Sequence, residues 1–319
     1  TRFLANELFG GYGLVILDAN DSGLKQLFVP YVKQELLKQT SFNAVSGTIE
    51  KFPSDYKIQV NPREINLFYI TEGIRERIVY EDGIYKINNT DISWTKEALL
   101  KHLDDFPERF SPNVLLRPLY QEVVLPNLCY IGGGGELAYW FEIKEMFAAF
   151  NVAFPMLLLR NSALIILEAQ QEKLTKLQLS ISDLFLKQTD LLAQKTKELS
   201  ELNIDFSTQK KFLKEQFAEL YAVAKRTDES FVGAVAAQEK KQLKGLVNLE
   251  KRLLKAEKRK LKEKLNSFIR LQNELFPKQS LQERNMNFSE LYLEYGEDLI
   301  SMLKRDFKPL IGDFLVIIL

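Results

Sequence analysis

The chain has 319 residues, 46% of them hydrophobic and 27% charged, which is typical of a globular protein with a full core and is long enough for about two domains. Lys and Arg together number 43, and Asp and Glu together also number 43, so the formal net charge is zero. This balance argues against electrostatic binding of nucleic acid by the chain as a whole. One cysteine and one histidine exclude an intrachain disulfide and a cysteine-rich or multi-histidine metal site.

The first predicted element is a strand at residues 14–17, a wholly apolar run that ends at Asp18. Apolar residues then recur at helical spacing from Leu24 to Val32, behind a group of capping residues. The order strand, loop, helix is that of an α/β protein. We therefore assign residues 1–43 to a segment of a parallel-sheet core.

Residues 44–112 have a different pattern and predict a small mixed α+β insertion. Strands are expected at residues 57–60 and 78–80, and a turn signal separates the second of these from a return strand at residues 84–87. A short helix is expected at residues 95–103.

The alternation of strands and helices resumes in residues 113–165. Strands separated by helices imply a parallel sheet with right-handed crossovers, and about three such strands make only part of a doubly wound domain. The expected elements are a helix at 115–125, a strand at 128–131, a glycine loop at 132–135, a helix at 136–150 and a strand at 155–159.

The remaining residues are mainly helical. Between residues 166 and 277 Gly and Pro nearly vanish, and narrow apolar seams with charged flanks predict a long coiled-coil domain. Eleven Lys or Arg against four Glu between residues 239 and 264 are more typical of a solvated helix face than of a nucleic-acid stripe. Residues 278–319 predict a helix near 291–304 and a terminal strand at 314–319 that returns to the core.

The glycine loop is the main candidate for a ligand site. Four glycines between a strand and a helix allow close approach of a ligand to backbone N–H groups at a helix N-terminus. The sequence is neither G-x-G-x-x-G nor a P-loop, so a merely tight turn is an equally good interpretation before the neighbours are considered. The four residues are Gly132, Gly133, Gly134 and Gly135.

Polar side chains occur near the same expected edge of the sheet. Polar groups that converge where parallel strands end predict a nucleotide or carboxylate site, although each of them taken singly is more simply a salt bridge or a cap. They are Arg160, Asn161 and Ser162 after one strand, Asp18 after another, and Arg117, Tyr120 and Gln121 on the helix before the glycine strand. The lone His102 is interpreted as a surface histidine and Cys129 as a small buried hydrophobe.

Several of these residues lie in motifs that resemble a known family. Residues 117–121 (RPLYQ) and 130–140 (YIGGGGELAYW), together with residues 155–162, are similar to the bacillithiol biosynthesis cysteine-adding enzymes of the BshC family. Residues 12–18, Tyr295-Gly296 and the apolar terminus extend the resemblance over nearly the whole chain. Because family members are longer, we expect the chain to be the C-terminal part of such a protein.

The resemblance implies the fold and the reaction. The fold would be a partial Rossmann-type parallel sheet with a connecting-peptide insertion and a coiled coil through which two copies associate. The reaction would join L-cysteine to glucosaminyl-malate, through a cysteinyl adenylate made from ATP, as in class I aminoacyl-tRNA synthetases. Mg²⁺ would enter only with ATP, since no metal site is evident, and no nucleic-acid or membrane partner is expected of this cytoplasmic enzyme.

The resemblance also suggests roles for particular residues. Arg160 and Glu136 are the candidate catalytic residues, with Arg160 and the glycine amides opposite the phosphoryl charge. The candidate binding residues are Asp18, Arg117, Gln121, Tyr130, Gly132, Gly133, Gly134, Gly135, Tyr139, Asn161 and Ser162. The alternative is a non-catalytic coiled-coil scaffold with a vestigial nucleotide-binding platform.

Overall fold

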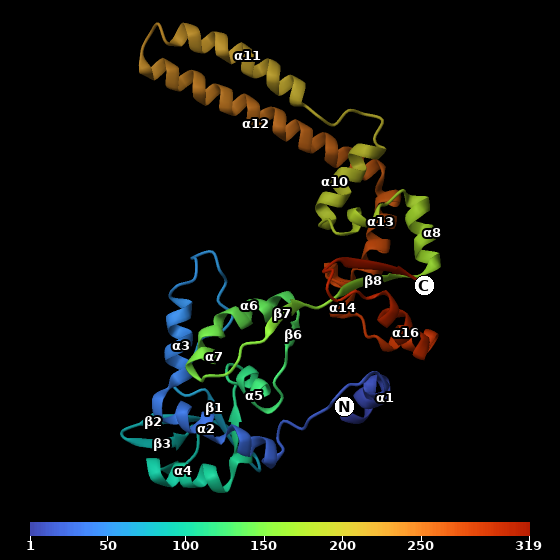
Figure 1. The fold of residues 1–319 in the computed structure, drawn as a ribbon. Helices are drawn as coiled ribbons and strands as arrows, with labels where there is room; N and C mark the ends of the chain where they lie inside the picture. The colour runs from blue at the N-terminus through green and yellow to red at the C-terminus, as the bar shows by residue number, and fades with distance from the viewer. The chain divides into compact units, whose positions relative to one another are not determined.

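The structure is a computed structural model that describes residues 1–319, and the chain divides into two compact units (Figure 1). The first unit contains Thr1–Asn161 and Lys308–Gly312, and the second contains Ser162–Phe307 and Asp313–Leu319. Each unit has a hydrophobic core of its own. No helix combines the length and the apolar character that crossing a bilayer requires. The finer division into five segments stays a prediction.

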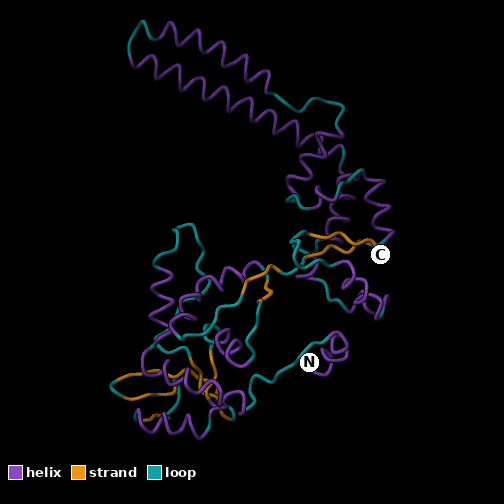
Figure 2. Tube along the Cα trace, in the orientation of Figure 1, coloured by secondary structure: helices purple, strands orange, loops and turns teal.

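The first unit combines helices with two separate sheets (Figure 2). Its helices are α1 (Arg2–Phe9), α2 (Ser22–Lys38), α3 (Thr40–Ile49), α4 (Lys96–Asp105), α5 (Arg117–Val124), α6 (Gly134–Glu142) and α7 (Lys144–Ala149), with the 3-10 turns η1 (Gly10–Tyr12) and η2 (Pro107–Arg109). Its strands are β1 (Leu67–Thr71), β2 (Ile74–Glu81), β3 (Ile84–Ile87), β4 (Ser93–Trp94), β5 (Phe110–Pro112), β6 (Cys129–Gly132) and β7 (Met156–Leu159).

The larger sheet is antiparallel, with the strand order β4-β3-β2-β1-β5. The predicted hairpin is confirmed: β2 pairs with β3 in the register Tyr80 to Tyr85, around a turn in which Asp82 and Gly83 both have positive φ. The predicted strand at residues 57–60 is wrong. The backbone N–H groups of Gln59 and Val60 instead donate to the carboxylate of Glu142, so they are not available to a sheet.

The smaller sheet is the parallel pair β6–β7, in the register Cys129 to Met156 through Gly132 to Leu159. This pairing confirms the parallel strands predicted on either side of the glycine loop. The expected first strand at residues 14–17 is wrong, because this segment forms no strand. An apolar run becomes a strand only where another backbone pairs with it, and β6 and β7 pair only with each other.

Helices α6 and α7 replace the single helix expected over residues 136–150. The first begins earlier than expected, at Gly134, and the chain leaves helical geometry at Ile143, whose φ is −100° and ψ is 4°. The break lets Trp140 and Phe147 both enter the core of the first unit, where each is at most 1% exposed. This core fixes α6, and with it the glycine turn, against α3 and α7.

The second unit is mainly helical. Its helices are α8 (Glu168–Leu177), α9 (Ile181–Leu184), α10 (Gln188–Leu199), α11 (Ser207–Ala224), α12 (Glu229–Lys260), α13 (Lys262–Leu275), α14 (Gln282–Asn285), α15 (Ser289–Tyr295) and α16 (Glu297–Asp306), with the 3-10 turn η3 (Pro277–Gln279). Its strands are β8 (Ser162–Ile166) and β9 (Phe314–Ile318), which pair in parallel. The predicted terminal strand is therefore present, but its partner is β8 and not the sheet of the glycine turn.

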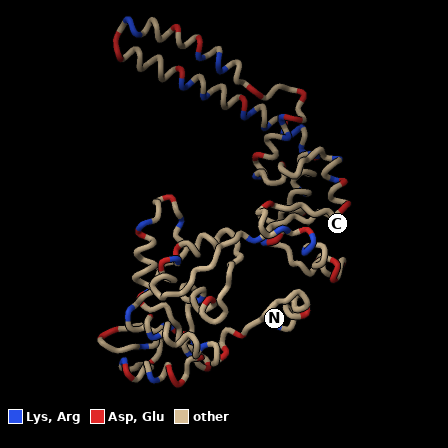
Figure 3. Tube along the Cα trace, viewed as in Figure 1, with Lys and Arg blue, Asp and Glu red and all other residues tan.

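Helices α11 and α12 form a hairpin and lie side by side (Figure 1). The carboxylate of Asp228 accepts a hydrogen bond from the backbone N–H of Phe231 and caps α12. Phe217, Ala224 and Val235 make a narrow buried seam between the two helices. Charges of both signs occur along the two helices (Figure 3), as expected for a solvated coiled-coil hairpin.

Candidate functional site

The glycine turn joins β6 directly to α6 and is tighter than the predicted four-residue loop. Gly132 ends the strand, Gly133 is the N-cap with an extended backbone, and Gly134 is the first helical residue. A Cβ atom on Gly132 would lie 2.7 Å from Cε1 of Tyr130, so this position requires glycine. A Cβ on Gly134 or Gly135 would meet no heavy atom within 4 Å, so the turn is open on the helix side.

The first turn of α6 presents backbone donors. The carboxylate of Glu136 accepts the N–H of Gly133 at 2.7 Å and caps the helix. The N–H groups of Gly134 and Gly135 have no acceptor within the helix, and both residues are exposed. The positive end of the helix dipole adds to these donors, so the turn can accept an anion.

Arg160 lies at the same edge of the parallel pair. Its backbone N–H donates to the carbonyl oxygen of Gly132 at 2.9 Å, which extends the ladder by one residue beyond β7. The side chain of Asn161 donates to the carbonyl oxygen of Lys308 at 3.4 Å. Ser162 belongs to the second unit, where it begins β8 and pairs with Phe314. Backbone pairing thus brings Arg160 and Gly132 together, and it gives Ser162 a different neighbourhood.

Helix α5 carries two of the predicted residues, and one of them, Arg117, lies close enough to Tyr139 of α6 to influence its pKa. The guanidinium of Arg117 donates to the side-chain oxygen of Gln121 at 3.2 Å. The hydroxyl of Tyr139 on α6 donates to the carbonyl oxygen of Val114, just before α5, at 2.5 Å. Burial raises the pKa of Tyr139 well above its usual range, and the positive charge of Arg117 opposes this rise, so the hydroxyl stays protonated.

Tyr130 is held by an aromatic neighbour. Its ring stacks on Trp140 with ring centroids 4.1 Å apart, and Trp140 is fully buried. Tyr130 therefore forms a rigid wall between the strand that enters the turn and the helix that leaves it.

Asp18 is linked to this group only indirectly. Its carboxylate is exposed and forms an ion pair with Arg2 at 2.8 Å. The next residue, Ala19, accepts a hydrogen bond at 3.0 Å from the hydroxyl of Tyr120 on α5. Tyr120 thus fixes the backbone beside Asp18, while the aspartate itself already has a cationic partner.

Two residues near the site have no signal in the sequence. Glu142 is fully buried at the end of α6 and accepts the backbone N–H groups of Gln59 and Val60 at 2.7 and 3.1 Å. The hydroxyl of Tyr56 donates to the carbonyl oxygen of Ala138 at 2.7 Å. These hydrogen bonds join the loop before β1 to α6. These contacts join residues about 80 positions apart, so no local pattern could predict them.

His102 corrects one prediction. It is half-buried rather than a surface residue, its ring stacks on Trp94, and its Nε2 lies 2.9 Å from the hydroxyl of Tyr69. Cys129 is also half-buried, so it is less enclosed than predicted. No group of three or more His, Cys, Asp or Glu side chains gathers closely enough to hold a metal ion.

The comparisons with known proteins agree on one family. Residues 1–161 match the family model described as "Bacillithiol biosynthesis BshC, N-terminal Rossmann-like domain", and residues 163–319 match its "C-terminal coiled-coil domain". A protein of Christiangramia forsetii named "Putative cysteine ligase BshC" is 58% identical over 99% of this chain and 59% of its own length. A protein of the same name from Flavobacterium psychrophilum is 59% identical over 99% of this chain and 60% of its own length. The chain thus spans about three fifths of the length of these relatives.

Proposed function

The chain belongs to the bacillithiol biosynthesis BshC family, and on that premise we propose that it is part of a cysteine ligase that joins L-cysteine to the amine of glucosaminyl-malate. Membership of this family supports a ligase activity, cysteine as a substrate and a role in bacillithiol biosynthesis. The observation in the molecule that supports a nucleotide-dependent reaction is the open glycine turn, with its unpaired N–H groups at Gly134 and Gly135.

The proposed reaction has two balanced steps. The carboxylate of cysteine attacks the α-phosphorus of ATP, the bond to pyrophosphate breaks, and cysteinyl adenylate forms. The amine of glucosaminyl-malate then attacks the cysteinyl carbonyl, AMP leaves and the amine loses a proton. Mg²⁺ would accompany the nucleotide phosphates and would need no dedicated protein ligands.

The residues of the site fit these steps. The first-turn amides of α6 and the guanidiniums of Arg117 and Arg160 are donors suited to the negative charge that grows on the phosphoryl oxygens. Glu136 already faces the turn and has the charge to receive the ammonium group of cysteine. Asp18, Gln121, Tyr130, Tyr139 and Asn161 are proposed to bind substrate or nucleotide groups around them. Ser162 is not included, because it begins β8 in the second unit.

Calorimetric titration of ATP into the chain tests the nucleotide part of this proposal. We expect saturable binding, and we expect Arg160→Ala to weaken it by about tenfold or more, because a hydrogen bond to a charged group contributes about 1.5–3 kcal/mol. The matched control is Arg77→Ala, which removes an exposed arginine from β2 and should bind ATP like the parent chain. Equal affinities of all three proteins would remove Arg160 from the site.

The ligation itself is best measured in the full-length relative of Christiangramia forsetii. Mass spectrometry should detect cysteinyl-glucosaminyl-malate, with one AMP released for each product molecule, only when ATP, cysteine and glucosaminyl-malate are all present. Product formed without ATP would overturn the adenylate route, and release of ADP in place of AMP would replace it with an acyl phosphate.

We also propose that two copies associate through the hairpin of α11 and α12, which would make the enzyme a homodimer. Phe212 is 61% exposed and Leu249 is 54% exposed, and they line one apolar groove on the hairpin. Solvent-facing apolar side chains of this size favour a protein partner.

A further inference from the structure

A groove between α8 and α13 in the second unit carries more positive than negative charge. It has a volume of about 330 Å³, and the half-buried Leu177 contributes apolar surface to it, above the fully buried Leu271. Lys173 and Lys176 line it from α8, while Ser267, Arg270 and Glu274 line it from α13. Because these positions are three, four or seven residues apart on each helix, each set lies on one helical face.

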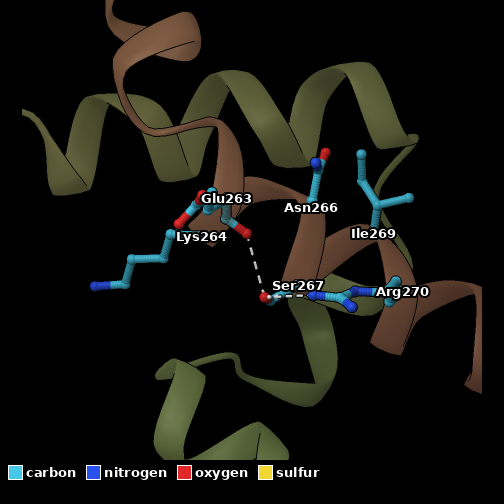
Figure 4. Close-up of a pocket in the computed structure, with 6 residues that line it drawn as sticks. All are labelled: Glu263, Lys264, Asn266, Ser267, Ile269 and Arg270. Carbon is cyan, nitrogen blue, oxygen red and sulfur yellow. Dashed lines mark hydrogen bonds between the residues drawn. The ribbon is translucent and has the colours of Figure 1, made fainter.

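A hydrogen bond holds the guanidinium of Arg270 in place, but most of its N–H donors have no acceptor. One of its nitrogens donates to the hydroxyl oxygen of Ser267 at 3.3 Å, and that hydroxyl donates to the carbonyl oxygen of Glu263 at 3.2 Å (Figure 4). No carboxylate pairs with Arg270, so its other N–H donors have no protein partner. Ser267 therefore fixes the side chain in an orientation that leaves a donor fork available.

The two lysines of the groove differ in whether they form an ion pair. Lys173 forms an ion pair with Glu274 at 3.3 Å, and both side chains are about half exposed, so this pair contributes little and can rearrange. Lys176 forms no ion pair. Three cations thus share one groove with a single carboxylate, and the repulsion between them decreases when an anion binds.

We propose that this groove is a binding site for a phosphate group carried by a small organic molecule. Arg270 presents parallel N–H donors that match phosphate oxygens, and Lys176 supplies a mobile second charge. The apolar surface of Leu177 accommodates the organic part, in a volume at the lower end of that of small-molecule sites. The site lies wholly within the second unit and is separate from the glycine turn.

Isothermal titration of the whole chain with glycerol 3-phosphate and with inorganic phosphate, at constant ionic strength set with chloride, tests the site. We expect saturable binding of both probes, and tighter binding of glycerol 3-phosphate because its organic part adds contacts in the groove. Arg270→Gln should weaken binding by about tenfold or more, since it removes charged hydrogen bonds. Lys176→Gln should weaken it by a smaller factor.

The control variants separate this site from two alternatives. Lys262→Gln removes an exposed charge from α13 outside the groove and should leave affinity unchanged. Arg160→Ala alters the glycine-turn site and should also leave the affinity of the groove for the probes unchanged. An absence of saturable heat, equal affinity in Arg270→Gln and the parent, or equal weakening by Lys262→Gln would each overturn the proposal. Loss of binding in Arg160→Ala alone would assign the phosphate to the glycine turn instead.

Discussion

Buried polar side chains in the first unit hold backbone segments that form no regular element. The carboxylate of Glu35 is fully buried, accepts hydrogen bonds from Ser41 and Asn66, and thereby joins the α2–α3 junction to the residues before β1. Asn66 accepts a further bond from Asn113, whose own side chain receives the backbone N–H of Leu115 just before α5. A continuous polar network thus fixes the start of the helix that carries Arg117 and Gln121.

Gly132 is the residue of the glycine turn that cannot be replaced by a larger one. In Gly132→Ala the new Cβ would meet the ring of Tyr130 at 2.7 Å, and this ring cannot retreat because it stacks on the buried Trp140. We expect the free energy of unfolding to fall by about 1–3 kcal/mol, as for other overpacked sites. Urea denaturation followed by circular dichroism measures the change. Gly135→Ala is the matched control and should be neutral or slightly stabilising, since its Cβ would meet no atom.

His102 should make the stability of the first unit sensitive to mild acid. Burial lowers its pKa, and the nearby charge of Arg109 lowers it further. The folded state therefore binds fewer protons than the unfolded state, and stability should be lost as the pH falls below about 6.5, the pKa of an unperturbed histidine. Because the chain has a single histidine, His102→Gln should flatten this dependence between pH 7.5 and 5.5 in urea titrations. Parallel losses in parent and variant would contradict the assignment.

Among the elements of the second unit, α9 and α10 are joined by a buried ion pair. Nζ of Lys195 lies 2.9 Å from Asp183 and 2.8 Å from Glu198, and Asp183 also accepts the backbone N–H of Ser180 in a capping box. Burial alone would raise the pKa of Asp183, but the hydrogen bonds from Lys195 and Ser180 outweigh it and hold the pKa below its usual range. The pair therefore contributes stability above about pH 4, which is lost as acid protonates Asp183.

Removing the cation tests this junction. Lys195→Met leaves the carboxylate of Asp183 buried without its partner, and we expect unfolding to become easier by about 3 kcal/mol. Lys197→Met, two positions away on the exposed face of α10, should change stability by less than about 0.5 kcal/mol. The double variant Asp183→Asn with Lys195→Met should recover part of the loss. A loss in Lys195→Met no greater than in Lys197→Met would show that the pair does not join the helices.

For the molecule as a whole, the association state is the property that the exposed hairpin predicts. Changing both Phe212 and Leu249 to serine removes two large apolar side chains from the α11–α12 groove. We expect the dimer dissociation constant to rise at least about tenfold, given about 1.5–3 kcal/mol for each buried side chain. Sedimentation equilibrium measures it, and Lys241→Ser on the same hairpin is the control. A parent chain that stays monomeric at high concentration would refute association through the hairpin.

The sequence by itself determined the elements whose causes are local. Four glycines between an apolar run and a helical pattern predicted a strand, a turn and a helix, and the structure has them as β6, the glycine turn and α6. Asp228 caps α12 through a hydrogen bond from the N–H of Phe231, and such a cause is local because a cap acts within three residues. The motifs around residues 117–121 and 130–140 were sufficient to indicate the family that the comparisons then showed.

Only the tertiary structure decided which apolar runs became strands and what the buried polar groups bind. Residues 14–17 and 156–159 are both short apolar runs, yet only the second is a strand, because only it has a neighbouring backbone with which to form hydrogen bonds. Glu142 resembles any charged helix residue until its partners at residues 59 and 60 are known. A strand partner and a buried acceptor are supplied by distant parts of the chain, so the pattern around a residue does not contain them.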